Sequence, residues 1–463
     1  MIKLSGQRNW FFYLASLLLL GGILGMQLFL QSGGTSHTES NCFLILYNFT
    51  PDLLKTVFDP LRTDWNLYQG RELSYFIDAI DARFIGWCIK HQIAHFYSLS
   101  AVLAAIAVLV IQQWGFACGF PKINCWTALL LSAVWQYAPC NFFHHYFRCG
   151  KPLTALGITA LLFSMRVLWV NEKRVNRIAA KALIIISSIW LPLIDRQGIF
   201  LLAALTVFSA AAYSFYDDTN KKNIFSTVAV SGVSSIALST LLNVAVVPKM
   251  IEYFNGYIPS FEYQKMPFTA VFDFYGTIYF LIDNIGFWFS GFDNGGVVII
   301  LLVVWLLWTL IKKKDYPSVF LTAYVFCVLG AMANLMMFRH RLLIMEGVSH
   351  SGYFTPFAAV LLFLLSYFTE KFEWKKCVVC LFCCVLVSQS VMTVFDSSDP
   401  EHNRFHRHST ARILRVLNDE KINPRSVLMP YTSWKLIDAF RGNLRGWELG
   451  SVPIKYPANK KSL

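Results

Sequence analysis

Apolar segments close to the length of a bilayer crossing recur along almost the whole chain. Hydrophobic residues make up 56% of the sequence, and charged residues make up only 14%. A transmembrane helix needs about 20 consecutive, mostly apolar residues, and several segments approach that length. This pattern excludes a soluble globular fold. The sequence therefore predicts an all-α polytopic membrane protein.

A sliding hydropathy window of about 19 residues predicts about 11 transmembrane helices. Their approximate bounds are residues 10–30, 95–113, 125–139, 152–170, 182–194, 199–213, 224–247, 296–311, 316–338, 354–368 and 377–395. Together they form a transmembrane domain over residues 1–395. The remaining segment, 396–463, has a helical pattern after Ser409 and a turn signal at Asn423-Pro424. We interpret it as a small soluble α/β appendage.

Basic residues mark alternate turns of the predicted bundle and so predict its orientation. They are Lys3, Arg8, Lys173, Arg174, Arg177, Lys181, Lys221, Lys222, Lys312, Lys313, Lys314, Lys371, Lys375 and Lys376. Cytoplasmic loops carry such an excess of Lys and Arg. The N-terminus is therefore expected to be cytoplasmic, with the first span acting as a signal anchor. An odd number of spans then places the C-terminus outside, together with the long segments 31–94 and 248–295.

Positive charge also occurs on the predicted outer side, where membrane proteins usually carry little of it. The residues concerned are Arg148, Lys151, Arg196, Arg339 and Arg341. An anionic ligand at the outer membrane surface would explain these cations. Ion pairs with carboxylates of the first outer segment, or with lipid phosphates, are the alternative explanation.

The first outer segment contains an amphipathic pattern from Gly70 to Trp87. Apolar residues at helical spacing form one face: Leu73, Phe76, Ile77, Ile80, Phe84 and Trp87. Arg71, Ser74 and Asp78 fall opposite, and Asp81 lies at the edge. We expect a helix that lies in the membrane interface, with its apolar side toward the bilayer and its charged side toward water.

The same segment supplies the candidate acid–base residues. A carboxylate held beside an attacking sugar hydroxyl can remove its proton, which is general-base catalysis. Asp64 is the first candidate because it directly precedes the aromatic stretch WNLYQGREL, and Asp59 and Glu72 follow it.

Basic and aromatic residues on the outer side form two further candidate sets. Guanidinium and ammonium groups can neutralise a phosphate leaving group, and the available residues are Arg71, Arg148, Lys151, Arg196 and Arg341. Aromatic rings and amides that could contact a sugar are Trp65, Tyr68, Gln69, Gln197, Tyr263 and Tyr353. Trp and Tyr are also enriched at any membrane interface, and for this last set we favour that explanation.

A charged triplet, Asp195-Arg196-Gln197, interrupts two apolar spans. Charges at such a place are costly unless they are paired or functional. A tight outer turn in which Asp195 pairs with Arg196 is one interpretation, and a role in a site is the other. No metal site is predicted, since adjacent histidines such as His144 and His145 point to different helix faces.

The layout resembles the GT-C glycosyltransferases, which are multi-spanning enzymes that use sugars on polyprenyl-phosphate carriers. Residues 64–73, DWNLYQGREL, are similar to an acidic-then-Gly-Arg-Leu pattern in bacterial glucosyltransferases that modify O-antigen. The turns 195–198 (DRQG) and 351–356 (SGYFTP) also look like turns of that superfamily. The chain departs from the pattern because no paired acidic residues directly follow the first span.

The resemblance implies an inverting transfer of a sugar from a polyprenyl-phosphate donor to a glycan or lipid acceptor. It also implies a place in the bacterial inner (plasma) membrane. Two alternatives stay open: a polymerase or ligase that uses a pyrophosphate-linked glycan, and a lipid flippase or transporter. Membrane lipids are expected contacts, and nucleic acid is not. We assign no cofactor, although a divalent cation, Mg²⁺ or Mn²⁺, stays open.

Overall fold

The computed structural model describes residues 47, 52–58, 67–68, 70–91, 99–118, 149–170, 173–256, 260–261, 304–305, 307–312, 318–319, 321–324, 356, 359–360 and 363. Within these residues the fold is helical, apart from one pair of two-residue strands. Four helices are long and apolar enough to cross a membrane: α8 (Gly150–Val170), α9 (Arg174–Ile194), α10 (Arg196–Phe215) and a continuous helix over Thr219–Asn255. This part of the chain therefore has the architecture of a helical membrane protein. The C-terminal α/β segment and several of the 11 predicted spans lie wholly or partly outside the described residues, so the count of 11 stays a prediction.

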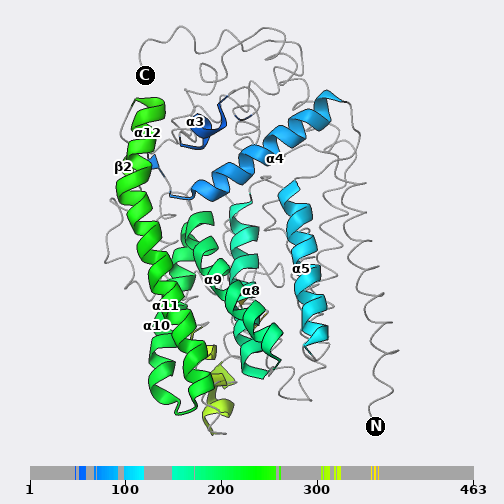
Figure 1. Ribbon diagram of the computed structural model, residues 1–463, viewed down its shortest axis with the longest axis vertical. Coiled ribbons are helices and arrows are strands. Elements are labelled where there is room, and N and C mark those ends of the chain that lie inside the picture. Colours follow the sequence, from blue (N-terminus) through cyan, green and yellow to red (C-terminus); the bar gives the residue numbers. More distant parts are fainter. Residues whose placement is uncertain are drawn as a thin grey trace.

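Helices α8, α9 and α10, with α11 (Thr219–Leu241), run side by side as a bundle (Figure 1). Each of these links is very short, and α9 and α10 are separated by Asp195 alone. A 21-residue helix is about 31 Å long, which matches the apolar thickness of a bilayer. Small residues let the helices approach closely: a Cβ on Gly157 would lie 3.0 Å from the Trp190 ring, and one on Gly232 would overlap Thr206.

The hydropathy spans predicted at 152–170, 182–194, 199–213 and 224–247 are shorter than the helices that contain them. Helix α9 begins at Arg174, whereas the predicted span begins at residue 182, because its first two turns carry Arg177 and Lys181 on the helix surface. The span predicted at 95–113 corresponds to α5 (Leu99–Ala117). Lys173, Lys221 and these basic residues all lie at one end of the bundle, where α8 meets α9 and α10 meets α11.

The fourth long helix consists of α11, a π-helical turn η1 (Leu242–Val246) and α12 (Val247–Asn255). Its 37 residues extend over about 55 Å, well beyond a bilayer core. The outer segment predicted to begin at residue 248 is therefore helical as far as Asn255. Pro248 cannot donate an N–H and would clash within a regular helix, and it lies in the first turn of α12 directly after the π turn.

The projecting helix α12 packs against the segment that precedes α4. Helix α3 (Leu53–Val57) begins at the N-cap Asp52, and Val57 is buried together with Val247 and Ile251 of α12. Strand β1 (Leu67–Tyr68) pairs in parallel with β2 (Ser260–Phe261). The two long segments predicted on one side of the membrane thus contact each other where they are described.

Helix α4 (Glu72–Lys90) crosses the ends of α5 and α8 at an angle (Figure 1). The helix and its apolar stripe were predicted, and Phe76, Ile80 and Trp87 are exposed. The expectation that its carboxylates face water was wrong, since Asp78 and Asp81 are buried. The polar face of α4 is turned toward the starts of the helices below it.

Candidate functional site

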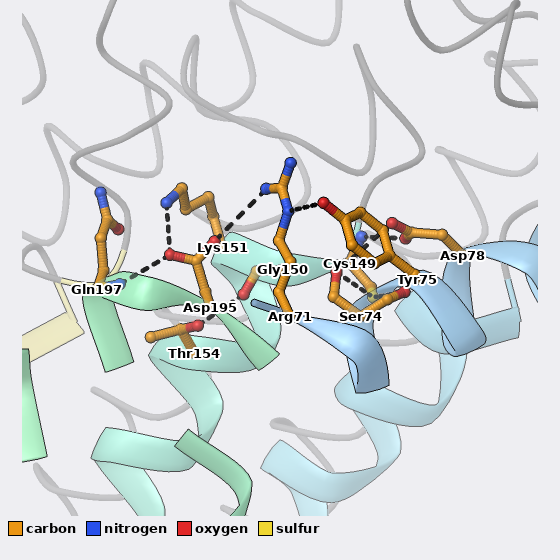
Figure 2. A network of polar contacts seen from close by, with 10 residues as sticks. All are labelled: Arg71, Ser74, Tyr75, Asp78, Cys149, Gly150, Lys151, Thr154, Asp195 and Gln197. Atoms are coloured by element: carbon orange, nitrogen blue, oxygen red, sulfur yellow. Dashed lines mark hydrogen bonds and ion pairs between the residues drawn. The ribbon is translucent and has the colours of Figure 1, made fainter. Parts of the chain in front are cut away.

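Arg71, Lys151 and Asp195 meet at the end of the bundle opposite its basic turns (Figure 2). The Nζ atom of Lys151 lies 2.7 Å from Oδ1 of Asp195, and the Nη1 atom of Arg71 lies 3.8 Å from Oδ2. Both Lys151 and Asp195 are buried, whereas Arg71 is partly exposed. We call these three residues the Arg71–Lys151–Asp195 cluster.

Asp195 owes its position to the turn between α9 and α10. Its extended backbone (φ −157°, ψ 150°) ends α9, and its carboxylate caps α10 by accepting a hydrogen bond of 2.9 Å from the Gln197 N–H. Gly198 permits this tight turn, because a Cβ there would lie 2.6 Å from the carbonyl carbon of Leu191. The sequence Asp-Arg-Gln-Gly therefore holds one carboxylate rigidly at the bundle end.

Lys151 lies in the first turn of α8, where the helix dipole disfavours a positive charge. The ion pair with Asp195 offsets this. Gly150 makes the approach possible, since a Cβ on it would come within 3.3 Å of Oδ2 of Asp195 and of Oγ of Ser74. The start of α8 is thus packed closely between α4 and the α9–α10 turn.

Arg71 precedes α4 and is oriented by Tyr75, one turn later. Its Nε donates to the Tyr75 hydroxyl at 3.1 Å, and its guanidinium lies 5.2 Å from the centre of the Tyr75 ring. Tyr75 is buried against Val57 of α3 and Val247 of α12. The position of Arg71 therefore depends on the packing of α3, α4 and α12.

The electrostatics keep Asp195 ionised. Burial alone would raise the pKa of its carboxyl, but Lys151 and Arg71 outweigh this and hold the pKa below its ordinary value. A carboxylate with two cations beside it forms a stable anchor for both of them. The cluster therefore holds two cations around one carboxylate at a bundle end, and Arg71 is the partly exposed one.

Asp78 and Asp81 cap two helices from α4. Oδ1 of Asp78 accepts from the Cys149 N–H at 2.9 Å at the start of α8, and Oδ1 of Asp81 accepts from the Ser100 N–H at 2.9 Å at the start of α5. The Ser100 hydroxyl also donates to Asp81. Burial raises the pKa of Asp81 to about 7, although the bonds from Ser100 oppose the shift. These carboxylates belong to the scaffold.

Four other candidate residues fall within the described part. Gln197 is buried beside the cluster, and Arg196 is half-buried at the start of α10. Glu72 is the first residue of α4 and is half-buried. Tyr68 lies in β1, where the structure describes its backbone. The remaining candidates lie outside the described residues: Asp59, Asp64, Trp65, Gln69, Arg148, Tyr263, Arg339, Arg341 and Tyr353.

The sequence interpretation offered either a role in a site for the triplet 195–197 or a pair between Asp195 and Arg196, and it did not identify the partners of Asp195. The carboxylate forms ion pairs with Lys151 and Arg71. The interpretation also gave no role to Tyr75 or to Asn243, a buried polar residue in the apolar run Leu241–Val247. A polar residue inside a span was the available signal for Asn243.

Among the described residues, no group of three or more His, Cys, Asp or Glu side chains could hold a metal ion. No protein-family model, no curated protein and no solved structure matches this chain.

Proposed function

We propose that this protein is a membrane-embedded glycosyltransferase that moves a sugar from a polyprenyl-phosphate carrier to a glycan or lipid acceptor. The observation that carries the proposal is the convergence of Arg71 and Lys151 on Asp195, at the end of an apolar bundle opposite its basic turns. A lipid-linked phosphate needs positive groups at the bilayer surface and apolar helices beside them. This arrangement supplies both.

The orientation belongs to the same proposal. The basic turns at Lys173–Lys181 and Lys221–Lys222 face the cytoplasm, so the cluster faces the outside of the plasma (bacterial inner) membrane. The N-terminus is then cytoplasmic and the C-terminus extracytoplasmic. The similarity of residues 64–73 to O-antigen-modifying glucosyltransferases is a second support, because Arg71 of that segment is a member of the cluster.

In this mechanism the phosphate is the leaving group. Arg71 provides a planar guanidinium that can bind phosphate oxygens in a bidentate manner, and Lys151 provides a point charge. Asp195 fixes the two relative to each other, which avoids the cost of reorganising them during the reaction. Arg196, at the start of α10, is a third donor.

Asp64 is the proposed general base. It removes the proton from an acceptor hydroxyl, whose oxygen then attacks the anomeric carbon of the donor sugar from the face opposite the phosphate. The bond from that carbon to the phosphate oxygen breaks, and the carrier phosphate leaves with the electron pair. The configuration at the anomeric carbon is inverted.

The charge distribution along the described spans favours an enzyme over a transporter. Transporters often place ionisable residues near the middle of their spans. Acidic and basic residues are absent from 152–165 of α8, 197–215 of α10 and 223–248 of the long helix. The charges of these helices lie toward their ends instead.

A transfer assay in vesicles tests the proposal. Purified protein is reconstituted with polyprenyl-phosphate-linked glucose as donor and a lipid-linked glycan as acceptor, and release of polyprenyl phosphate is measured. Removal of a positioned charge should lower kcat/KM by about 100-fold or more in Arg71→Ala, Lys151→Met and Asp64→Asn. Lys181→Ala, at the opposite end and exposed, should retain wild-type activity.

Full activity in both Arg71→Ala and Lys151→Met would exclude the assigned phosphate site. Loss of activity in Arg71→Ala together with full activity in Asp64→Asn would favour the polymerase or ligase alternative. Movement of labelled lipid across the bilayer without release of sugar would favour a flippase.

A further inference from the structure

The long helix changes its pitch beside the cluster. Residues Leu242–Val246 form a π-helical turn between α11 and α12, and Asn243 lies within it. From Thr219, 24 residues of helix reach about 36 Å, so Asn243 lies near the membrane surface. Single π-helical turns in long helices are often associated with functional sites. A functional role is therefore expected for this π-helical turn.

The amide of Asn243 has a defined orientation. Its side chain is buried, with 8% of its surface exposed, and its Nδ2 donates to the backbone oxygen of Ser239 at 2.9 Å. Only the nitrogen end can make that bond, so Oδ1 must point the other way. Within the part of the chain that the structure describes, Oδ1 is a buried atom with no hydrogen-bond partner. Such an atom in a folded protein calls for an explanation.

Oδ1 points at Gly70, the residue before Arg71. A Cβ on Gly70 would overlap Oδ1 and would lie only 2.6 Å from Cγ of Asn243. The Gly70 hydrogen that a Cβ would replace is therefore directed at the amide oxygen, as in a weak Cα–H···O contact. Any other residue at position 70 would require the Asn243 side chain, or the backbone that carries Arg71, to shift.

Arg71 is thus held from two places on the same long helix. On one side Gly70 rests on Asn243 of the π turn. On the other side Tyr75, which receives a hydrogen bond from Arg71, is packed on Val247 and Ile251 just after that turn. Both contacts fix the segment from Gly70 to Tyr75 against η1 and the start of α12.

We propose that Asn243 is a positioning residue for Arg71, which it holds in register with Lys151 for binding of the donor phosphate. This role rests on the proposed function. Asn243 touches no reacting atom in it and acts through the Gly70–Arg71 backbone.

The first experiment does not depend on catalysis. The full-length protein in lipid nanodiscs is treated with phenylglyoxal, and modification of Arg71 is followed by mass spectrometry, with exposed Arg174 as the internal reference. Loss of the contact in Asn243→Ala, and the overlap created in Gly70→Ala, should each increase the modification rate of Arg71 about ten-fold, while Arg174 is unchanged. Asn243→Leu has a side chain of similar volume but cannot form the hydrogen bond to Ser239. This variant replaces Asn243→Ala in the experiment if Asn243→Ala does not fold. An Arg71 rate equal to that of the wild type in these variants would overturn the proposal.

The second experiment combines substitutions at positions 70 and 243, so that side-chain volume added at one position is removed at the other. Gly70→Ala should raise the donor KM about ten-fold. Adding Asn243→Ala should bring KM back toward the wild-type value, because the methyl group added at position 70 then fills the space left by the Asn243 amide and restores the contact. Melting temperatures of the same samples separate this effect from general destabilisation. A double variant no better than Gly70→Ala would contradict the assigned contact. If no variant and no wild-type sample transfers sugar, but the Arg71 reactivity still changes, the proposed function fails and the positioning contact stands.

Discussion

The ammonium group of Lys151 lies 2.7 Å from the carboxylate of Asp195, and this buried ion pair ties the start of α8 to the turn between α9 and α10. The same carboxylate caps α10 and attracts Arg71, which precedes α4. One acidic residue thus connects four helices at one end of an apolar bundle.

Asp195→Asn should destabilise the protein strongly. Asparagine can still cap α10, so the change mainly removes the charge that compensates buried Lys151. Breaking a buried ion pair in this way costs about 3–5 kcal/mol. The free energy of unfolding in mixed micelles measures the effect. The double variant Asp195→Asn/Lys151→Met, which removes the stranded cation, should recover much of the loss. If Asp195→Asn alone were as stable as the wild type, the ion pair between Asp195 and Lys151 would not be buried as described.

Asp81 should make stability depend on pH between about 4 and 7. Its pKa rises in the folded protein from 3.8 to about 7 because the carboxyl is buried. A raised pKa favours the folded state only while the group is protonated, so this contribution is present below pH 3.8 and is lost as the pH rises through 7. The slope is at most about 1.4 kcal/mol per pH unit.

The measurement for Asp81 is the difference in unfolding free energy between the wild type and Asp81→Asn, followed across this pH range. Relative to the variant, the wild type should become less stable as the pH rises. Asp195 does not interfere, because its pKa is lowered and its contribution is lost only below the ordinary value of 3.8. A constant difference from pH 4 to pH 8 would disprove the assignment.

Gly198→Ala should be far more harmful than Gly256→Asn. The added Cβ at position 198 would lie 2.6 Å from a backbone carbon of Leu191, which cannot move without opening the α9–α10 turn. Overpacking of this kind costs about 1–3 kcal/mol. Gly256 ends α12 with φ 73° in open space, a conformation that Asn tolerates. Melting temperatures in detergent provide the comparison, and an equal decrease in the two variants would contradict it.

The orientation of α4 can be tested with a photoreactive phenylalanine analogue. Placed at Phe76, which is 37% exposed on the apolar face, it should crosslink to lipid. Placed at buried Tyr75, it should crosslink within the protein, toward α3 or α12. The reverse pattern would mean that the polar face of α4 is turned outward.

Hydropathy predicted the described spans well, since each needs a long apolar stretch whatever its neighbours are. The errors concern the residues at which the helices begin and end. The window excluded the first eight residues of α9, because Arg174, Arg177 and Lys181 lower the mean hydropathy although the helix continues through them with these residues at its surface. It also ended the last described span before Pro248, and only the π turn shows how the helix continues past that residue.

For α4, the amphipathic pattern predicted a helix and its apolar stripe, but it could not decide where the polar stripe would point. A carboxylate is well solvated in water, but it can also be accommodated in the protein interior where backbone N–H groups donate hydrogen bonds to it. The starts of α5 and α8 offer such groups, from Ser100 and Cys149, only after the chain has folded.

At the candidate site, the sequence alone determined that Arg71, Lys151 and Asp195 occupy turns and helix starts outside the apolar stretches, and that such charges need partners. The tertiary structure decided which partners they have. Asp195 pairs with Lys151 and Arg71, and Gly70 rests on Asn243. The physical reason is that apolar length is a property of each segment by itself, whereas an ion pair or a close backbone contact depends on distances between segments that are far apart in the chain.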